Sequence, residues 1–214
     1  MSNILILGAN GSIAEVVEEM LLKNTSDQVT LFMRTPSKLG REPIEGREKI
    51  IQGDVTNYQQ ILKAVQGQDI VYANLLGTDS KLQAEMVIKA MEEAHIERLV
   101  WVSVLGIYNE VPGKFGEWNN EEIYDDYIKP YAEAAEVIEK SNIKYTLIRP
   151  AWLTYNDEVD YELTQKGETF KGTEVSRKSV ADFIVKIIQD PSLEVNHSVG
   201  IDKPGTDGDK PAWF

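Results

Sequence analysis

Short apolar runs alternate with amphipathic stretches along the whole of this 214-residue chain. The apolar runs are rich in Val, Ile and Leu, which is typical of strands that are buried on both faces of a parallel sheet. Between them, apolar residues recur at helical spacing. We expect strands at 3–7, 28–33, 49–52, 69–76, 98–104, 144–150 and 195–201, and helices at about 12–24, 57–67, 79–94, 122–141 and 177–190.

This alternation predicts an α/β fold with a doubly wound parallel sheet, that is, a Rossmann fold. Right-handed crossovers connect the first six strands in such a sheet. No Gly/Ser-rich or Pro-rich linker interrupts the pattern, and a chain of this length can bury one full core. We therefore expect a single domain over residues 1–214.

Two segments lack a clear period and are expected on the substrate side of that domain, namely 105–122 and 151–176. The first is expected to be mainly a loop, with Asn119 and Glu122 forming a capping box for the helix that follows. The final segment, DKPGTDGDKPAWF, either docks on the body or on a partner, or stays loose.

The charge of the chain bears on its partners. The formal net charge is −13, which repels nucleic acid unless a basic patch overrides the overall field. The densest basic group, formed by Arg34, Lys38 and Arg41, is followed at once by Glu42 and Glu45. Nucleic-acid binding is therefore disfavoured as the main activity.

The chain has no cysteine, which excludes disulfides, thiolate nucleophiles and cysteine metal sites. Its first residues lack the basic region of a signal peptide, and no apolar run approaches the length of a membrane span. A cytoplasmic protein without membrane attachment is expected. His95 and His197 lie far apart without a second ligand at metal spacing, so no metal site is expected.

Gly8, Gly11 and Ala14 are spaced three residues apart in GANGSIA, between the first strand and the first helix. Gly8 permits a sharp turn, Gly11 leaves room for a diphosphate, and Ala14 lets the helix pack tightly on the strand. The N–H groups and the dipole at this helix end attract phosphates, and Ser12 can add its hydroxyl. In this context the motif predicts a dinucleotide site; a glycine turn without a ligand is the alternative.

The end of the second strand distinguishes the two nicotinamide dinucleotides. An NAD site has Asp or Glu there, to accept hydrogen bonds from the ribose 2′-hydroxyl. This chain has Arg34 in LFMRTPSKL, and a guanidinium suits a 2′-phosphate and stacks on adenine. Thr35, Ser37 and Lys38 can add donors. We therefore favour NADP(H) over NAD(H) as the cofactor; a solvated basic loop is the alternative.

Seven segments follow, in order, the marks of one family: GANGSIA, RTPSKL, GDVTN, ANLLG, WVSVLG, YTLIRPAWL and VSRKSVADFIV. In these segments the chain resembles the atypical short-chain dehydrogenase/reductases. Within them it is most similar to the small NAD(P)H-binding, NmrA-like branch, which includes the biliverdin and flavin reductases. The resemblance covers nearly the whole chain and implies an oxidoreductase, but it does not name a substrate.

The resemblance also implies site residues beyond the glycine turn. Asp54–Val55 resembles the pair that receives adenine, and Ala73–Leu75 resembles the segment beside the ribose. Ser103 is similar to the catalytic serine of the family, and Arg149–Trp152 resembles the turn that flanks the nicotinamide. Motif and resemblance together predict cofactor contacts from Gly8, Asn10, Gly11, Ser12, Ile13, Arg34, Lys38, Asp54, Val55, Ala73, Asn74, Leu75, Arg149 and Pro150.

Some of these residues also fit purely structural roles. Asp54 is a good cap for a following helix, and Asn74 can satisfy backbone groups in a turn. Pro150 ends its strand whatever binds nearby.

The Tyr-x-x-x-Lys pair of short-chain dehydrogenases is incomplete here. In the family both side chains reach one spot, where the tyrosine moves a proton and the lysine lowers its pKa. The resemblance places the tyrosine at Tyr127, and Tyr131 stands at the lysine position. Lys129 points to another face of a helix, and Pro130 disfavours helical geometry there; whether it replaces the lysine stays open. An unassisted phenol, with a pKa of roughly 10, is a poor base.

Hydride transfer itself requires only a bound nicotinamide and an acceptor stacked on it. We therefore expect an NADPH-dependent reductase of a planar small molecule such as a quinone or flavin, with Ser103 and Tyr127 as the candidate catalytic residues. Aromatic residues in 107–122 and 151–170 suit such an acceptor, or equally cover the core or a dimer contact.

Two other functions remain open from the sequence. A dinucleotide-binding redox sensor of NmrA type is the main alternative. An isomerase or dehydratase with a tightly held cofactor is less favoured, because the chain is too short for the sugar-nucleotide subdomain of such relatives. The protein is expected to be a monomer or a homodimer.

Overall fold

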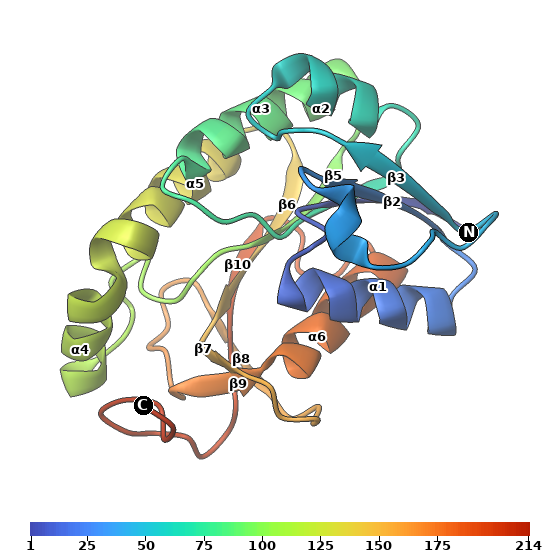
Figure 1. The fold of residues 1–214 in the computed structure, drawn as a ribbon. Helices are drawn as coiled ribbons and strands as arrows, with labels where there is room; N and C mark the ends of the chain where they lie inside the picture. The colour runs from blue at the N-terminus through green and yellow to red at the C-terminus, as the bar shows by residue number, and fades with distance from the viewer.

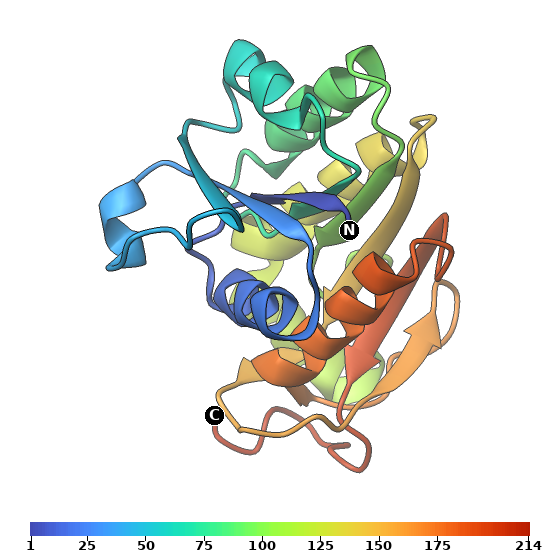
Figure 2. The same ribbon diagram turned by 90° about the vertical axis from the view of Figure 1, so that its right-hand side faces the viewer.

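The computed structural model describes residues 1–214, and it shows helices on both faces of a twisted sheet (Figures 1 and 2). The main sheet has eight strands in the order β3-β2-β1-β4-β5-β6-β10-β8, and only β8 runs antiparallel to its neighbour. The strand order reverses between β1 and β4, as in a doubly wound sheet. The predicted fold class is therefore confirmed.

The strands are β1 (Asn3–Leu7), β2 (Gln28–Met33), β3 (Glu48–Gln52), β4 (Ile70–Ala73), β5 (Arg98–Val102), β6 (Lys144–Pro150), β7 (Trp152–Thr154), β8 (Glu162–Gln165), β9 (Glu174–Ser176) and β10 (His197–Asp202). The helices are α1 (Ser12–Asn24), α2 (Tyr58–Val65), α3 (Ser80–Glu93), α4 (Gly113–Ile123), α5 (Lys129–Glu139) and α6 (Arg177–Gln189). A 3₁₀ turn, η1 (Pro36–Leu39), and a π-helical turn, η2 (Tyr124–Ile128), complete the helical segments. None of the helices is long and apolar enough to cross a lipid bilayer.

Alternate residues of β1 face opposite layers of the molecule. Ile4 and Ile6 pack in the core with α1 and α6, whereas Leu5 and Leu7 pack in the core with α2, α3 and α5. All four side chains are fully buried, and burial of each stabilises the fold by roughly 1.5–3 kcal/mol. Burial on both faces is the reason that the strands read as continuous apolar runs.

The segment 105–122 is not mainly a loop, because α4 occupies most of it. Phe115 is buried and Trp118 packs partly against the same core. The predicted capping box is wrong: Asn119 lies inside α4, is buried, and accepts a hydrogen bond from the Trp152 indole at 2.9 Å.

The expected helix at 122–141 is also interrupted. The π-helical turn η2 joins α4 to α5, and Pro130 is the second residue of α5. Proline lacks the N–H that would bond back to the carbonyl four residues earlier, and an insertion of this kind relieves that loss.

The segment 151–176 contains three short strands. Strands β7 and β9 form a separate two-stranded parallel sheet, and β8 adds an antiparallel edge to β10. The last residues, 203–214, run back along this region toward α4 (Figure 1). The Thr173 hydroxyl donates to the Thr206 carbonyl at 2.6 Å. The last segment therefore docks on the body of the domain.

Candidate functional site

Two cavities meet at the carboxyl ends of the parallel strands, where the strand order reverses. The polar cavity has a volume of about 530 Å³ and the apolar cavity about 420 Å³. Both are lined by Gly11, Asn74, Leu75 and Leu76, so they form one continuous site. In doubly wound proteins ligands bind in this crevice.

Most of the predicted contact residues line these cavities. Those on the polar cavity are Gly8, Asn10, Gly11, Arg34, Lys38, Asp54, Val55, Asn74 and Leu75. The apolar cavity adds Ser12, Ile13, Ser103, Tyr127 and Pro150.

Two glycines shape the turn between β1 and α1, and the backbone itself requires glycine at the first of them. Gly8 has a φ of +75°, and a Cβ on it would lie 2.3 Å from the Asn74 carbonyl oxygen. A Cβ on Gly11 would lie 2.0 Å from the Asn74 side-chain nitrogen. Gly11 is also the N-cap of α1 and offers no side-chain cap. The N–H groups of the first helical turn are therefore available to an anion.

The polar cavity contains the basic residues predicted for a 2′-phosphate. Arg34 and Lys38 are both exposed and line it from the end of β2 and the 3₁₀ turn η1. The side chain of Asn10 donates to the Thr35 carbonyl at 3.1 Å, while its own oxygen is buried without a protein partner. That unpaired oxygen is an acceptor available to a bound ligand.

Asp54 also lines the polar cavity, after the end of β3. It accepts hydrogen bonds from the backbone N–H and hydroxyl of Thr56, at 2.9 and 2.7 Å. These bonds, with a smaller effect of the nearby Arg34 charge, lower the pKa of the Asp54 carboxyl. Asn57, not Asp54, is the N-cap of α2, so Asp54 does not cap this helix.

Ser103 and Tyr127 both line the apolar cavity, the first from the loop after β5 and the second from η2. The backbone N–H of Ser103 donates to the Ile148 carbonyl at 2.7 Å, but its hydroxyl is buried without a partner. Tyr127 is 40% exposed. Ser103 therefore lines the apolar cavity and has a hydroxyl without a protein partner.

Tyr131 stands one helical turn after Tyr127. Its hydroxyl donates to the Leu75 carbonyl at 2.8 Å, and burial raises its pKa. The two tyrosine rings have centroids 6.2 Å apart. Lys129 is exposed and lines neither cavity. Tyr131 is therefore a structural neighbour of Tyr127 that supplies no positive charge.

Two of the predicted contacts are not at the cavities. Arg149 is fully buried, where it pairs with Glu110 and donates to the Ser198 hydroxyl at 3.1 Å. Neighbouring residues of a strand point to opposite faces, so Pro150 reaches the apolar cavity while the Arg149 side chain does not. Ala73 is buried in β4 within the core that faces α2, α3 and α5.

The sequence interpretation missed Arg177, which begins α6 and is the one charged residue on the apolar cavity. Its Nε donates to the Ser12 hydroxyl at 2.9 Å and one Nη donates to the Leu153 carbonyl at 3.0 Å. Its guanidinium also covers the Tyr155 ring at 3.8 Å. The signal lay in VSRKSVADFIV, but only the packing of α6 beside α1 places it at the glycine turn (Figure 1).

The structure has no cluster of His, Asp and Glu side chains suited to a metal ion. A glycine turn at the first crossover, an uncapped helix end and a crevice at the strand reversal together define a Rossmann-type dinucleotide-binding protein.

Comparison with known proteins agrees with this class. The sequence matches the model of the NAD(P)H-binding family over residues 8–191, and the chain belongs to this family. Among curated proteins, none matches the sequence.

Similar solved structures cover nearly the whole chain. A Rossmann-fold NAD(P)-binding family protein from Shigella flexneri is 46% identical, with a TM-score of 0.84 and 100% of both chains covered. A short-chain dehydrogenase/reductase from Veillonella parvula, solved in complex with NADP, is 30% identical, with a TM-score of 0.89 and 99% of each chain covered. The predicted resemblance to atypical short-chain dehydrogenase/reductases is therefore confirmed.

A more distant structure shares the fold. An anaerobillin reductase from Escherichia coli O157:H7 is 18% identical, with a TM-score of 0.79 over 97% of this chain and 100% of that chain. This likeness shows the fold alone.

Proposed function

We propose that this member of the NAD(P)H-binding oxidoreductase family is an NADPH-dependent reductase of a planar acceptor such as a quinone or flavin. The observation that carries the proposal is the continuity of the two cavities through Gly11, Asn74, Leu75 and Leu76. A dinucleotide in the polar cavity reaches through this shared region into the apolar cavity, where an acceptor has space.

The residues present fit such a cofactor. Gly8 and Gly11 present no side chain to the polar cavity that they line, the first turn of α1 has no side-chain cap, and the Asn10 oxygen is buried without a protein partner. Arg34 and Lys38 supply the positive charge that favours the 2′-phosphate of NADP(H) over the 2′-hydroxyl of NAD(H). In this proposal Arg177, held against Ser12, adds a guanidinium for the diphosphate.

In this proposal the side chains of the protein position the acceptor and stabilise the charge that develops on it. When bound, NADPH supplies a hydride, and a quinone that takes up this hydride and one proton from water becomes a hydroquinone, leaving NADP⁺. The Ser103 hydroxyl, which has no protein partner, donates a hydrogen bond to an acceptor oxygen as negative charge develops there. Apolar walls from Val102, Leu105 and Ile123 exclude bulk water from the acceptor.

The residue Tyr131 favours a reductase in which no neighbouring positive charge lowers the pKa of a catalytic tyrosine. The family lysine would bring an ammonium group to Tyr127, whereas the Tyr131 hydroxyl is engaged with the Leu75 carbonyl. Reduction of a conjugated acceptor does not require proton abstraction from an alcohol. The residues of this site therefore support the reduction of a conjugated acceptor.

The proposal is tested by the consumption of NADPH, followed at the nicotinamide absorbance band, with menadione and lumiflavin as acceptors. We expect at least one of them to raise consumption well above the rate without protein. A redox sensor would instead bind NADP⁺ and NADPH with different affinities and consume neither. Background consumption with every acceptor would contradict the reductase proposal and favour the sensor.

The Tyr127→Phe variant is expected to keep turnover within about tenfold of the original protein, because water supplies the proton. A positioned general acid typically contributes 10²–10⁴-fold. The rate constant for menadione reduction checks this expectation. A loss beyond a hundredfold would show that the Tyr127 hydroxyl is the proton donor.

A further inference from the structure

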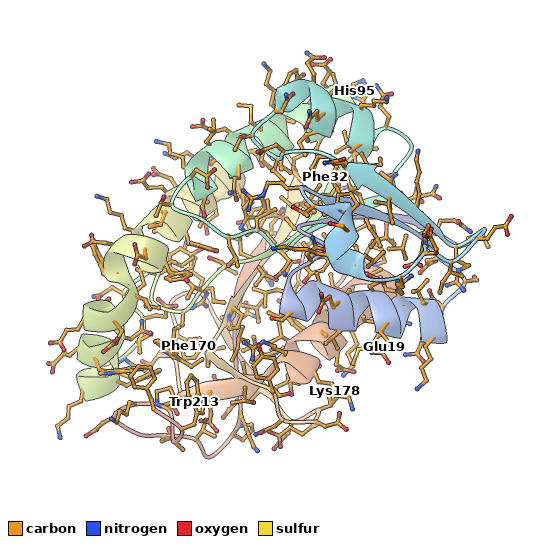
Figure 3. All side chains as sticks on the ribbon, in the orientation of Figure 1. Glu19, Phe32, His95, Phe170, Lys178 and Trp213 are labelled. Atoms are coloured by element: carbon orange, nitrogen blue, oxygen red, sulfur yellow. The ribbon has the colours of Figure 1, made fainter.

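Residues 203–214 come from the far end of the sequence to the rim of the apolar cavity. Lys203 pairs with Glu158 at 2.8 Å, and the backbone N–H of Ala212 donates to Glu174 at 3.2 Å. Trp213 lies between α4 and β9 in the view of Figure 3. Trp213 is the single member of this segment that lines the apolar cavity.

An aromatic cluster holds Trp213 in this place. Its ring centroid lies 6.1 Å from that of Trp152 and 5.8 Å from that of Phe214. Phe214 in turn contacts Trp118 edge-on at 4.7 Å and Trp152 at 5.5 Å. These pairs have the tilted and edge-to-face geometries that stabilise aromatic contacts. Trp213 therefore packs against Trp152 on β7 and Phe214 in its own segment, and Phe214 packs in turn against Trp118 on α4.

Trp213 is nevertheless half exposed, at 53%. It lines the apolar cavity without being buried, so it belongs to the cavity wall and not to the core. Trp152 and Leu153 continue this wall, and Ser103 lines the same cavity. An acceptor bound in this cavity lies within walls that include the indole of Trp213.

The apolar cavity offers a modest volume beside this wall. Its volume of about 420 Å³ is near the lower end of the roughly 300–1,000 Å³ range of small-molecule sites. The nicotinamide end of a dinucleotide takes up part of this space. The remainder suits a compact ring system more than an extended one.

We propose that Trp213 is a specificity-determining residue, which confines the acceptor site to compact quinones of about two fused rings and disfavours the three-ring isoalloxazine of flavins. This inference rests on the proposed reductase function, because it identifies the acceptor of the same site. It also assigns a role to the segment 203–214, which positions the indole.

The test compares menadione, a two-ring quinone, with lumiflavin, an uncharged three-ring flavin, in steady-state NADPH oxidation. The Trp213→Ala variant is expected to raise the ratio of kcat/KM for lumiflavin over menadione at least tenfold, mainly through a lower KM for lumiflavin. Trp213→Phe retains a ring and is expected to return the ratio most of the way to the original value. A ratio within twofold of the original in Trp213→Ala would overturn the proposal.

A matched control lies in the same segment. Asp209→Asn removes an exposed ion pair with Lys114, 3.1 Å long, and Asp209 does not line the cavity. Exposed pairs of this kind contribute little to stability, so the acceptor ratio is expected to stay within twofold. A tenfold change in this control would show that general loosening of the segment, and not the indole, sets the ratio.

Failure of the reductase proposal can be told apart from failure of this inference. If the original protein oxidises NADPH with neither acceptor, calorimetric binding of menadione and lumiflavin to the NADP⁺-loaded protein replaces the kinetic readout. If lumiflavin binding tightens at least tenfold relative to menadione binding in Trp213→Ala, the result would support the role of Trp213 as a wall of the site even though the protein is not a reductase. Unchanged relative affinity, or no binding of either compound, would overturn it.

Discussion

Replacement of Gly8 by alanine is expected to weaken NADPH binding at least a hundredfold. Gly8 has a φ of +75°, and its added Cβ would lie 2.3 Å from the Asn74 carbonyl oxygen. This oxygen belongs to the backbone and cannot yield unless the segment after β4 moves. Because Gly8 and Asn74 both line the polar cavity, such a movement distorts the dinucleotide site itself. Calorimetric titration with NADPH measures the loss.

The same substitution is expected to lower the free energy of unfolding by roughly 1–3 kcal/mol, the cost of a strained backbone. Gly67→Ala is the matched control, because Gly67 also has a φ of +75° but has no neighbour within 4 Å of an added Cβ. We expect this control to lose some stability in denaturant unfolding and to keep its NADPH affinity. Equal NADPH affinities of the two variants would contradict a specific role for Gly8.

Replacement of Arg34 by glutamate is expected to reverse the preference between NADPH and NADH. In the proposed complex the substitution removes a charge-assisted contact to the 2′-phosphate, worth about 1.5–3 kcal/mol, and adds repulsion. A carboxylate at this strand end also accepts hydrogen bonds from the 2′-hydroxyl of NADH. We expect the affinity for NADPH to fall a hundredfold or more and that for NADH to rise several-fold, as measured by calorimetry.

The control for the change in net charge is Lys49→Glu. Lys49 is exposed on β3 and lines neither cavity, so it alters the overall charge by the same amount without touching the site. It is expected to leave the ratio of the two affinities unchanged. If Arg34→Glu retains the original preference, the 2′-phosphate is recognised by other residues.

Much of the fold could be predicted because its signals are local. The apolar runs and the glycine turn each lie within a few residues, and the strands buried on both faces leave little room for another interpretation. Helix α4 could not be predicted in this way. Its glycines and asparagines have low helix propensity, and the helix is stabilised by packing of Phe115 and Trp118 against distant parts of the chain.

The site shows the same division between local and tertiary signals. Gly8, Gly11 and Arg34 are recognisable by their places in the first two strand–helix units. Arg177 is not, because it reaches Ser12 across 165 residues. Trp213 likewise reaches the cavity only through the docking of its segment on Trp152.

Strand alternation could have corrected one expectation in advance. Pro150 faces the apolar cavity, so its neighbour Arg149 has to point to the other face of β6. There the guanidinium is paired with Glu110 in the interior. The backbone of this turn, not the Arg149 side chain, is thus what lies near the cavity.

The central claim is that the turn between β1 and α1 holds the diphosphate of a nicotinamide dinucleotide. Calorimetric titration of the unmodified protein with NADPH and with NADH tests it most directly. The account predicts one saturable site per chain, with tighter binding of NADPH. The absence of binding heat with both dinucleotides, together with unchanged tryptophan fluorescence, would contradict it.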